Sequence, residues 1–422
     1  MKLMPKLSFK RPWGLLSNTL FRAAEFADAW VGLPSKVSDS LHFRQDWRNF
    51  FPSRRPDDPT LWIHGASVGE IEDLAALFSE PSALKLMGYP LHRIVITASS
   101  ISARERLENW RHRGFAYCGP LPPESVREIK AFLYLLKPEL MVLSHSDIWP
   151  VAFEEAKRSL KKGCLWLPSR IPSSRTLMND ELGNFVQTIG CRSVAELDHF
   201  RESPLPGTPD LVWIGNPRVD RILSRIRGAQ PQLTHALDEW GCRPDKGRIS
   251  WILGSCWLED AQIVAGALGR LTAQEVARFQ IVVIPHETKD AHLVAAIQSI
   301  LPMARVLTVQ GVLAEAYRDF DLALVGGGFK TGLHNVLEPT LWEVPAIVGP
   351  LLRQQPEAPA LQKIGQLHVV SSIDTLALFL KKLLNAQELS AFKAKSKLAA
   401  RELRAHEGAT LRLAELIRKK SQ

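Results

Sequence analysis

Short runs of β-branched and apolar residues alternate with stretches of helical spacing from Leu61 onward. A first series of runs predicts strands at residues 61–64, 93–98, 140–144, 164–168 and 185–190. After a short apolar run that ends at Gly215, a second series predicts strands at 250–254, 280–285, 305–309, 322–326, 346–349 and 367–371. Strands that alternate with helices in this way form parallel βαβ units. The pattern therefore predicts an α/β protein with two doubly wound parallel sheets.

The chain has 422 residues, which is too many for one ordinary core and favours two large domains. Proline and glycine cluster between the two series of strands, so we place the boundary near 216–230. The expected domains are 51–218 and 219–385. Residues 386–422 have helical spacing, and we expect Gly408 to divide them into two helices that pack back on the first domain.

Hydrophobic residues make up 45% of the chain and charged residues 23%, as in ordinary soluble globular proteins. The five cysteines are scattered, so we expect buried free thiols in a reducing compartment. The formal net charge of +9 indicates a surface that attracts phosphates, nucleic acid or an anionic lipid leaflet. Because the positive residues are spread and no recognition motif is present, we expect no nucleic-acid partner.

Residues 1–50 combine basic side chains with Trp, Leu and Phe in an amphipathic, helical pattern. Arg22, Glu25 and Asp28 interrupt every apolar run before the ~18 residues that a membrane-spanning helix needs. The segment also lacks the apolar region and cleavage site of a signal peptide. Two interpretations stay open: a helix that lies in a membrane interface, or a helix that packs on the first domain.

The string LWIHGASVGEIEDL at 61–74 runs from a predicted strand through a Gly/Ser turn into a predicted helix. Such a turn usually holds an anion, because free backbone N–H groups and the helix dipole point at it. Here the acidic residue Glu70 occupies the turn. Ser67 and Glu70 form the S-x-x-E pattern of a capping box, in which both side chains accept hydrogen bonds from the backbone. On the residues alone, this structural interpretation is favoured over a catalytic one.

The string VGGGFKTGLHNVLEPTLWEVPAIVGP at 325–350 is more specific. A strand runs into Gly326, Gly327 and Gly328, which let a ligand approach the backbone closely. The HNVLEP segment then opens a helix whose N-terminus favours phosphate. Glu338 lies in the first turns of this helix, where its carboxylate can accept hydrogen bonds from two adjacent ribose hydroxyls. Neither G-x-G-x-x-G nor a P-loop lysine is present, so nicotinamide and ATP are not indicated.

Five strings come in the order seen in one enzyme family: IHGASVGE, IGNPRVD, ILGSCWLED, VIPHETKD and VGGGFKTGLHNVLEP…VPAIVGP. Over roughly residues 60–415 the chain resembles the 3-deoxy-D-manno-octulosonic acid (Kdo) transferases of lipopolysaccharide synthesis. The resemblance implies a GT-B glycosyltransferase, with two Rossmann-like domains facing a central cleft and an amphipathic N-terminal helix. It implies CMP-Kdo as donor, a lipid A precursor (lipid IVA) as acceptor, and no metal or other cofactor. It also implies a peripheral enzyme at the anionic cytoplasmic face of the inner membrane.

By the same resemblance, Glu70 matches the catalytic base, which accepts the proton of the attacking sugar hydroxyl while Kdo leaves CMP with inversion. Arg218 in GNPRVD matches a Lys or Arg that stabilises the departing phosphate or the donor's carboxylate. His145 stands where members have glutamate or lysine, at a position of transition-state stabilisation. On the acceptor side the matching residues are Ser67, Asp147 and Arg170.

The match also assigns residues of the second half to CMP-Kdo binding: Pro285, His286, Gln310, Gly311, Val312, Gly327, Asn335, Val336, Leu337 and Glu338. Ser255 is a further donor-side candidate, with a plain helix N-cap as the open alternative. The first half departs further from the family, for example at Val151, where asparagine is usual. Two other functions stay open: a GT-B enzyme with a UDP-sugar donor, and a non-catalytic descendant that binds nucleotide or lipid.

Overall fold

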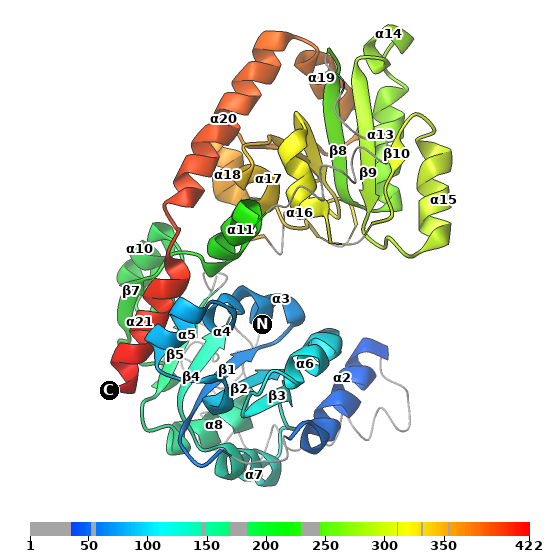
Figure 1. Ribbon diagram of the computed structural model, residues 1–422. Coiled ribbons are helices and arrows are strands. Elements are labelled where there is room, and N and C mark those ends of the chain that lie inside the picture. Colours follow the sequence, from blue (N-terminus) through cyan, green and yellow to red (C-terminus); the bar gives the residue numbers. More distant parts are fainter. Residues whose placement is uncertain are drawn as a thin grey trace, which may run out of the picture. The chain divides into compact units, whose positions relative to one another are not determined.

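The computed structural model describes residues 35–51, 56–144, 149–168, 184–228, 245, 247–309, 311–330, 332–352 and 355–422. The chain divides into two compact units (Figure 1). Unit 1 consists of Met1–Arg218 and Gly408–Gln422, and unit 2 of Val219–Glu407. Most of the predicted amphipathic segment, residues 1–34, lies outside the described residues.

Unit 1 is built on a parallel sheet with seven strands among the described residues, in the order β3-β2-β1-β4-β5-β6-β7. Strands β2 and β3 are therefore added on one side of β1, and strands β4 to β7 on the other side. The strands are β1 (Thr60–Gly65), β2 (Ile94–Ala98), β3 (Tyr117–Pro120), β4 (Pro138–Ser144), β5 (Cys164–Leu167), β6 (Thr188–Cys191) and β7 (Asp210–Trp213).

The helices of unit 1 follow from apolar residues at helical spacing. In α7 (Val126–Leu136), the buried residues Ile129, Phe132, Leu133 and Leu136 form one face, and the helix ends at Lys137 in a left-handed conformation. The other helices are α2 (Ser35–Gln45), α3 (Val68–Asp73), α4 (Ala76–Ser79), α5 (Pro81–Met87), α6 (Arg104–Arg111), α8 (Pro150–Ser159), α10 (Val194–Glu202) and α21 (Ala409–Ser421). Short 3₁₀ helices are η1 (Asp46–Phe50), η2 (Leu91–Arg93) and η3 (Ile101–Ala103).

Unit 2 is built on a parallel sheet with six strands in the described part of the chain, in the order β10-β9-β8-β11-β12-β13. The strands are β8 (Ile249–Cys256), β9 (Phe279–Pro285), β10 (Arg305–Val306), β11 (Leu322–Val325), β12 (Ala346–Val348) and β13 (Leu367–Val369). The helices are α11 (Pro217–Gly228), which leads in from unit 1, α13 (Leu258–Leu268), α14 (Ala273–Val276), α15 (Ala291–Ile300), α16 (Leu313–Ala316), α17 (Leu337–Leu341), α18 (Ala358–Ile364), α19 (Ile373–Leu383) and α20 (Ala386–Arg404), with the 3₁₀ helix η4 (Tyr317–Asp319).

Helices cover both faces of the unit 2 sheet. Alternate strand residues point to opposite faces, so Ile252 packs with α11, α17 and α18, whereas Trp251 and Leu253 pack with α13, α15 and α19. Both faces are apolar, which is why the strands read as continuous hydrophobic runs. The predicted fold class, two doubly wound parallel sheets, is confirmed.

The two C-terminal helices belong to different units. Helix α20 contacts α17, α18 and α19 of unit 2, and α21 contacts α5 and α4 of unit 1. Gly408, with a φ of 84°, lies between them in the left-handed conformation that glycine adopts readily. The predicted division of this segment at Gly408 is confirmed.

Some strand predictions were wrong in detail. Strand β3 has the sequence YCGP, whose Gly and Pro indicate a turn, and it was not predicted. The strand predicted at 185–190 begins at Thr188, and the one predicted at 305–309 is reduced to Arg305–Val306. The four cysteines in the described residues are buried and unpaired, as predicted. No helix within the described ranges is both long and apolar enough to cross a bilayer.

Candidate functional site

Each sheet has a topological switch point. This is the position between two neighbouring strands at which the order of strand addition reverses. Ligands of doubly wound proteins bind there, at the carboxyl ends of the strands. In unit 1 the switch point lies between β1 and β4, and in unit 2 between β8 and β11. The candidate residues of the sequence follow these strands: Glu70 follows β1, Ser255 lies at the end of β8, and Gly327 follows β11.

Glu70 lies in the first turn of α3, immediately beyond the carboxyl end of β1. Its Oε2 accepts a hydrogen bond of 2.5 Å from the backbone N–H of Ala66. The chain is tightly folded here, because a Cβ added to Gly65 would lie 3.0 Å from the Glu70 Cβ. The half-buried carboxylate therefore sits at a helix N-terminus, where backbone N–H groups stabilise its negative charge.

The predicted capping box is only half formed. Ser67 is the N-cap residue of α3 but its side chain makes no capping hydrogen bond. Glu70 reaches back to the N–H of Ala66, one residue before the N-cap, instead of the N-cap N–H. The hydroxyl of Ser67 is therefore not used by the helix start, which corrects the structural interpretation of the S-x-x-E pattern.

Arg218 is held beside the same helix by an ionic network. Its Nε lies 3.4 Å from Oδ1 of Asp73, the last residue of α3, and Nη1 of Arg192 lies 3.5 Å from Oδ2 of the same carboxylate. The backbone N–H of Arg218 donates to Oδ1 of Asn216, which fixes the start of α11. Helix α3 thus carries a carboxylate near each end: Glu70 in its first turn, and Asp73, which contacts Arg218, as its last residue.

Arg192 is almost entirely buried, with 4% of its surface exposed. Its Nε and Nη2 have no hydrogen-bond partner among the described residues, so Asp73 supplies its one ionic contact there. A buried guanidinium is costly unless a carboxylate compensates it. Asp73 therefore serves two arginines, one buried and one at the candidate site.

Four predicted residues lie outside the described part of the chain. His145 and Asp147 follow β4 in the chain, and Arg170 follows β5, but all three lie outside the described residues. In sequence, His145 and Asp147 come after the second strand of the unit 1 switch point. Gln310 of the donor set is also outside the described residues.

In unit 2, a buried carboxylate organises the glycine-rich turn after β11. Oδ2 of Asp260 accepts hydrogen bonds from the N–H of Gly327 at 3.0 Å and from the N–H of Trp257 at 2.9 Å. Burial raises the pKa of Asp260 to about 6, and the two backbone hydrogen bonds oppose this shift. Asp260 thereby ties the start of α13 to the turn.

The glycines are required by the chain's own packing. A Cβ at Gly326 would lie 2.2 Å from the carbonyl oxygen of Ser255, and one at Gly328 would lie 2.6 Å from the backbone of Gly349. Gly327 has a φ of 86°, and a Cβ there would lie 2.3 Å from the carbonyl oxygen of Gly332. We expected a ligand to lie close to Gly326 and Gly328. In the structure, backbone atoms of Ser255 and Gly349 occupy the space next to these glycines.

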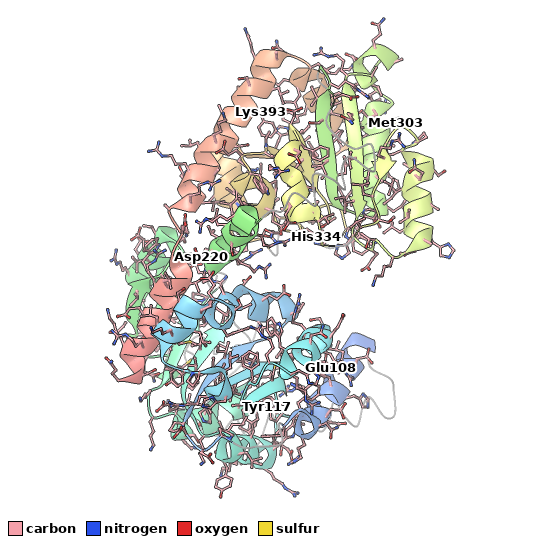
Figure 2. The ribbon with its side chains drawn as sticks, viewed as in Figure 1. Glu108, Tyr117, Asp220, Met303, His334 and Lys393 are labelled. Carbon is pink, nitrogen blue, oxygen red and sulfur yellow. The ribbon has the colours of Figure 1, made fainter. Side chains whose placement is uncertain are left out.

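Three aromatic rings meet at the same switch point. The indole N–H of Trp257 donates to Nε2 of His334 at 3.0 Å. The His286 ring stacks on Trp257 with centroids 4.5 Å apart and on His334 with centroids 4.3 Å apart. Lys330 places its ammonium 4.6 Å from the centre of the Trp257 ring. Figure 2 shows His334 beyond one end of the unit 2 sheet.

Both histidines are neutral at pH 7. Burial lowers the pKa of His334 to about 4, with the neighbouring His286 adding to the shift, and burial also lowers the pKa of His286. Nε2 of His334 accepts a hydrogen bond from the indole N–H, so it carries no proton of its own. The single N–H of the neutral His334 ring is therefore on Nδ1. The ring group therefore offers a flat, uncharged surface with one oriented N–H donor.

The other predicted donor residues lie on the same edge of the unit 2 sheet. Pro285 ends β9 and His286 follows it. Asn335 accepts the N–H of Leu337 at 3.0 Å and so fixes the start of α17, whose first turn carries Glu338. Val336 and Leu337 are buried, and Val312 precedes α16. The carbonyl oxygen of Gly311 accepts a hydrogen bond from Arg225.

Ser255 is not a helix cap. It adopts a φ of 51° at the irregular end of β8, and Trp257 is the N-cap residue of α13. Sequence reasoning therefore missed Trp257 and Asp260, although both lie in the quoted string GSCWLED. It also missed Asp73 and Arg192, which carry no local motif.

The fold is the GT-B architecture, with two doubly wound parallel α/β units. Solved structures with this fold include UDP-GlcNAc 2-epimerase from Neisseria meningitidis, 13% identical with a TM-score of 0.59, covering 86% of this chain and 100% of that one. MurG from Acinetobacter baumannii is 15% identical with a TM-score of 0.54, covering 86% and 100%. At these identities the likeness concerns the fold alone.

The chain is similar to Kdo transferases. The model of the family described as 3-deoxy-D-manno-octulosonic-acid transferase (kdotransferase) matches residues 42–166. A 3-deoxy-D-manno-octulosonic acid transferase of Chlamydia pneumoniae is 27% identical over 357 residues, or 79% of either chain. One of Aquifex aeolicus is 24% identical over 320 residues, or 72% of this chain and 80% of the relative. The predicted resemblance is confirmed.

Proposed function

We propose that the protein transfers Kdo from CMP-Kdo to lipid IVA, with inversion and without a metal ion. Glu70 is the general base. The observation that carries this proposal is the position of its half-buried carboxylate in the first turn after β1, at the switch point of unit 1. The hydrogen bond from the N–H of Ala66 favours the ionised form, which a base requires.

In the proposed reaction, a sugar hydroxyl of the acceptor attacks the anomeric carbon of Kdo while the bond from that carbon to the phosphate oxygen of CMP breaks. Glu70 accepts the hydroxyl proton. Arg218, positioned by Asp73, stabilises the negative charge that develops on the departing phosphate. His145 assists this stabilisation, and Ser67, Asp147 and Arg170 contact the acceptor.

Unit 2 binds the donor through the carboxyl edge of its sheet. Neutral rings and backbone groups suit a nucleotide, because bases stack on flat surfaces and phosphates accept hydrogen bonds from backbone N–H groups. We assign this role to residues at the ends of β8 to β11 and the start of α17: Ser255, Pro285, His286, Gln310, Gly311, Val312, Gly327, Asn335, Val336, Leu337 and Glu338.

The acceptor is a lipid, so the enzyme works at a membrane surface. We place it at the cytoplasmic face of the inner membrane as a peripheral protein. The net charge of +9 supports this assignment, because basic proteins are attracted to anionic headgroups.

The test is product formation from CMP-Kdo and lipid IVA, analysed by mass spectrometry. Glu70→Ala is expected to lower the transfer rate by a factor of about 10²–10⁴, the contribution of general-base catalysis. Glu72→Ala, which removes a partly exposed carboxylate of the same helix that pairs with Arg106, is the matched control. Near-normal turnover of a folded Glu70→Ala protein would remove Glu70 from the mechanism.

A further inference from the structure

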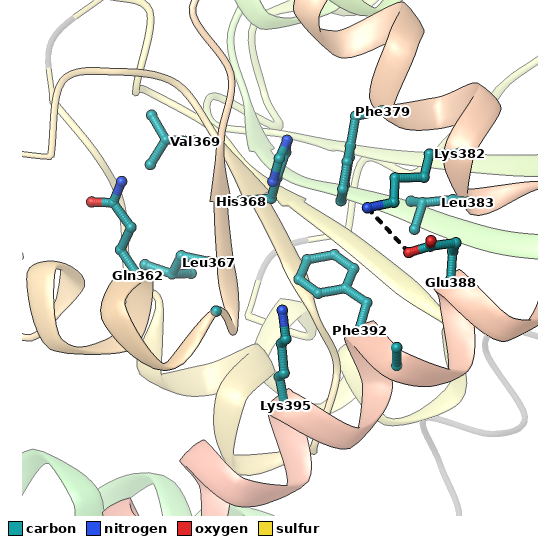
Figure 3. A pocket seen from close by; sticks show the side chains of 12 residues that line it. Gln362, Leu367, His368, Val369, Phe379, Lys382, Leu383, Glu388, Phe392 and Lys395 are labelled. Atoms are coloured by element: carbon teal, nitrogen blue, oxygen red, sulfur yellow. Dashed lines mark ion pairs between the residues drawn. The ribbon is translucent and has the colours of Figure 1, made fainter.

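Unit 2 contains a second candidate binding site on its edge strand. A cavity of about 420 Å³ lies between α18, β13, α19 and α20 (Figure 3). Strand β13 is the last strand of the sheet, separated from β11 by β12. No residue assigned above to donor or acceptor binding lines this cavity, so it is distinct from the switch point.

One part of the cavity wall is aromatic. The ring of His368 lies parallel to that of Phe379, with centroids 3.4 Å apart and an interplanar angle of 10°. Phe392 meets Phe379 edge to face at 5.4 Å. Burial lowers the pKa of His368, and the nearby Lys382 and Lys395 lower it further, so the ring is neutral at pH 7. Neutral, stacked rings of this kind favour contact with another flat ring.

The other part of the wall is basic. Lys382 forms an ion pair of 3.1 Å with Glu388, which Figure 3 marks, and the two charges offset one another. Lys395 pairs with no carboxylate in the described part of the chain. Its aliphatic stem lies against Gly365, where an added Cβ would be 2.8 Å from the Lys395 Cδ. With His368 neutral, the lining residues carry one net positive charge, contributed by Lys395.

We propose that this cavity binds a small aromatic anion, whose flat ring contacts His368 and the two phenylalanines and whose carboxylate, sulfonate or phosphate group lies near Lys395. The cavity has the volume of an ordinary small-molecule site. An uncharged apolar molecule does not neutralise the Lys395 ammonium, and a small inorganic anion does not cover the aromatic rings. The cavity therefore favours a molecule that has both an aromatic ring and an anionic group.

The test uses anilinonaphthalene sulfonate, a flat aromatic anion whose fluorescence rises in apolar surroundings, with the full-length protein. Lys395→Met removes the charge but keeps the stem, and we expect it to weaken binding about fivefold or more. Ala391→Phe places a ring in the cavity from an exposed position of α20 and is expected to abolish binding at this site. Lys397→Met removes an exposed lysine of the same helix outside the cavity and is the control.

Competition identifies the chemistry of the occupant. Naphthoate is expected to displace the probe, whereas decanoate and inorganic phosphate are not. Displacement by decanoate without displacement by naphthoate would overturn the aromatic assignment. Probe binding that Lys395→Met or Ala391→Phe leaves unchanged, in proteins with unaltered circular dichroism, would place the probe elsewhere and overturn the proposal.

Discussion

The candidate residues at the two switch points differ in charge. In unit 1 the candidate groups are charged: Glu70 is stabilised by a backbone N–H, and Arg218 is held by Asp73, which also pairs with the buried Arg192. In unit 2 the site consists mainly of neutral rings, glycine backbone and one buried carboxylate, with the Lys330 ammonium over the Trp257 ring. Charges stabilise developing charge, whereas rings and backbone recognise shape. The difference is consistent with the proposal that unit 1 supplies the chemistry and unit 2 binds the donor.

The largest effect is expected at the carboxylate shared by two arginines. Asp73→Ala leaves Arg192 buried without its partner, and breaking a buried ion pair on one side costs about 3–5 kcal/mol. Urea unfolding followed by circular dichroism measures the loss. Glu72→Ala is the control, because its partner Arg106 is exposed and such pairs contribute about 1 kcal/mol or less.

The double variant Asp73→Ala with Arg192→Met sharpens this prediction. Methionine removes the buried charge, so most of the lost stability is expected to return. If Asp73→Ala is no more destabilising than Glu72→Ala, the ionic network does not hold unit 1 together.

The next effect is on turnover. Arg218→Ala removes the cation proposed to stabilise the departing phosphate, and kcat is expected to fall about a hundredfold, the scale of losing one transition-state contact. The Kd for CMP is expected to change less than kcat. Initial transfer rates and a CMP titration measure the two quantities, with Arg227→Ala, an exposed position of the same helix, as control. Weaker CMP binding with unchanged kcat would contradict the division of roles.

The complementary prediction concerns unit 2. Trp257→Ala removes the ring that stacks with His286 and orients His334. We expect CMP affinity to fall about thirtyfold, since stacking contributes about 1 kcal/mol and the hydrogen bond a similar amount. Trp257→Phe keeps the stack and is expected to lose less. Calorimetric titration with CMP and with UDP measures both affinities. Equal affinities of the two variants would show that the stacked ring contributes nothing, and a preference for UDP would favour the alternative donor.

The fold could be predicted because each strand and helix follows from the hydrophobic pattern of a short segment. Buried parallel strands are continuous apolar runs, and only segments with turn-like composition, such as β3, escaped. The same holds for site residues within motifs, such as Glu70. The contacts that organise the sites join distant residues: Arg192 and Asp73 are 119 positions apart, and Trp257 and His334 are 77 apart. A local sequence pattern cannot indicate contacts between residues so far apart in the chain. The ionic network of unit 1 and the ring cluster of unit 2 could therefore be identified only from the structure.

The smallest predicted effect tests the neutrality of the rings in unit 2. The pKa of His334 is lowered from 6.5 to about 4, so the unfolded chain binds a proton there before the folded protein does. Stability therefore falls as pH decreases from above 6.5 toward 4. Between pH 7.5 and 6 the loss is at most about 0.8 kcal/mol, reduced by solvent screening because the ring is half-buried.

His334→Asn removes this term, so the stability difference between wild type and variant is expected to narrow by that amount as pH falls to 6. Asp260 acts in the opposite direction, because its raised pKa stabilises the folded protein as pH falls through about 6. Both proteins retain Asp260, so its contribution cancels in the comparison. Urea unfolding at the two pH values measures the difference. A difference that stays constant would show that His334 titrates near its ordinary value, and the flat surface at the end of the unit 2 sheet would then be partly protonated near pH 6.5.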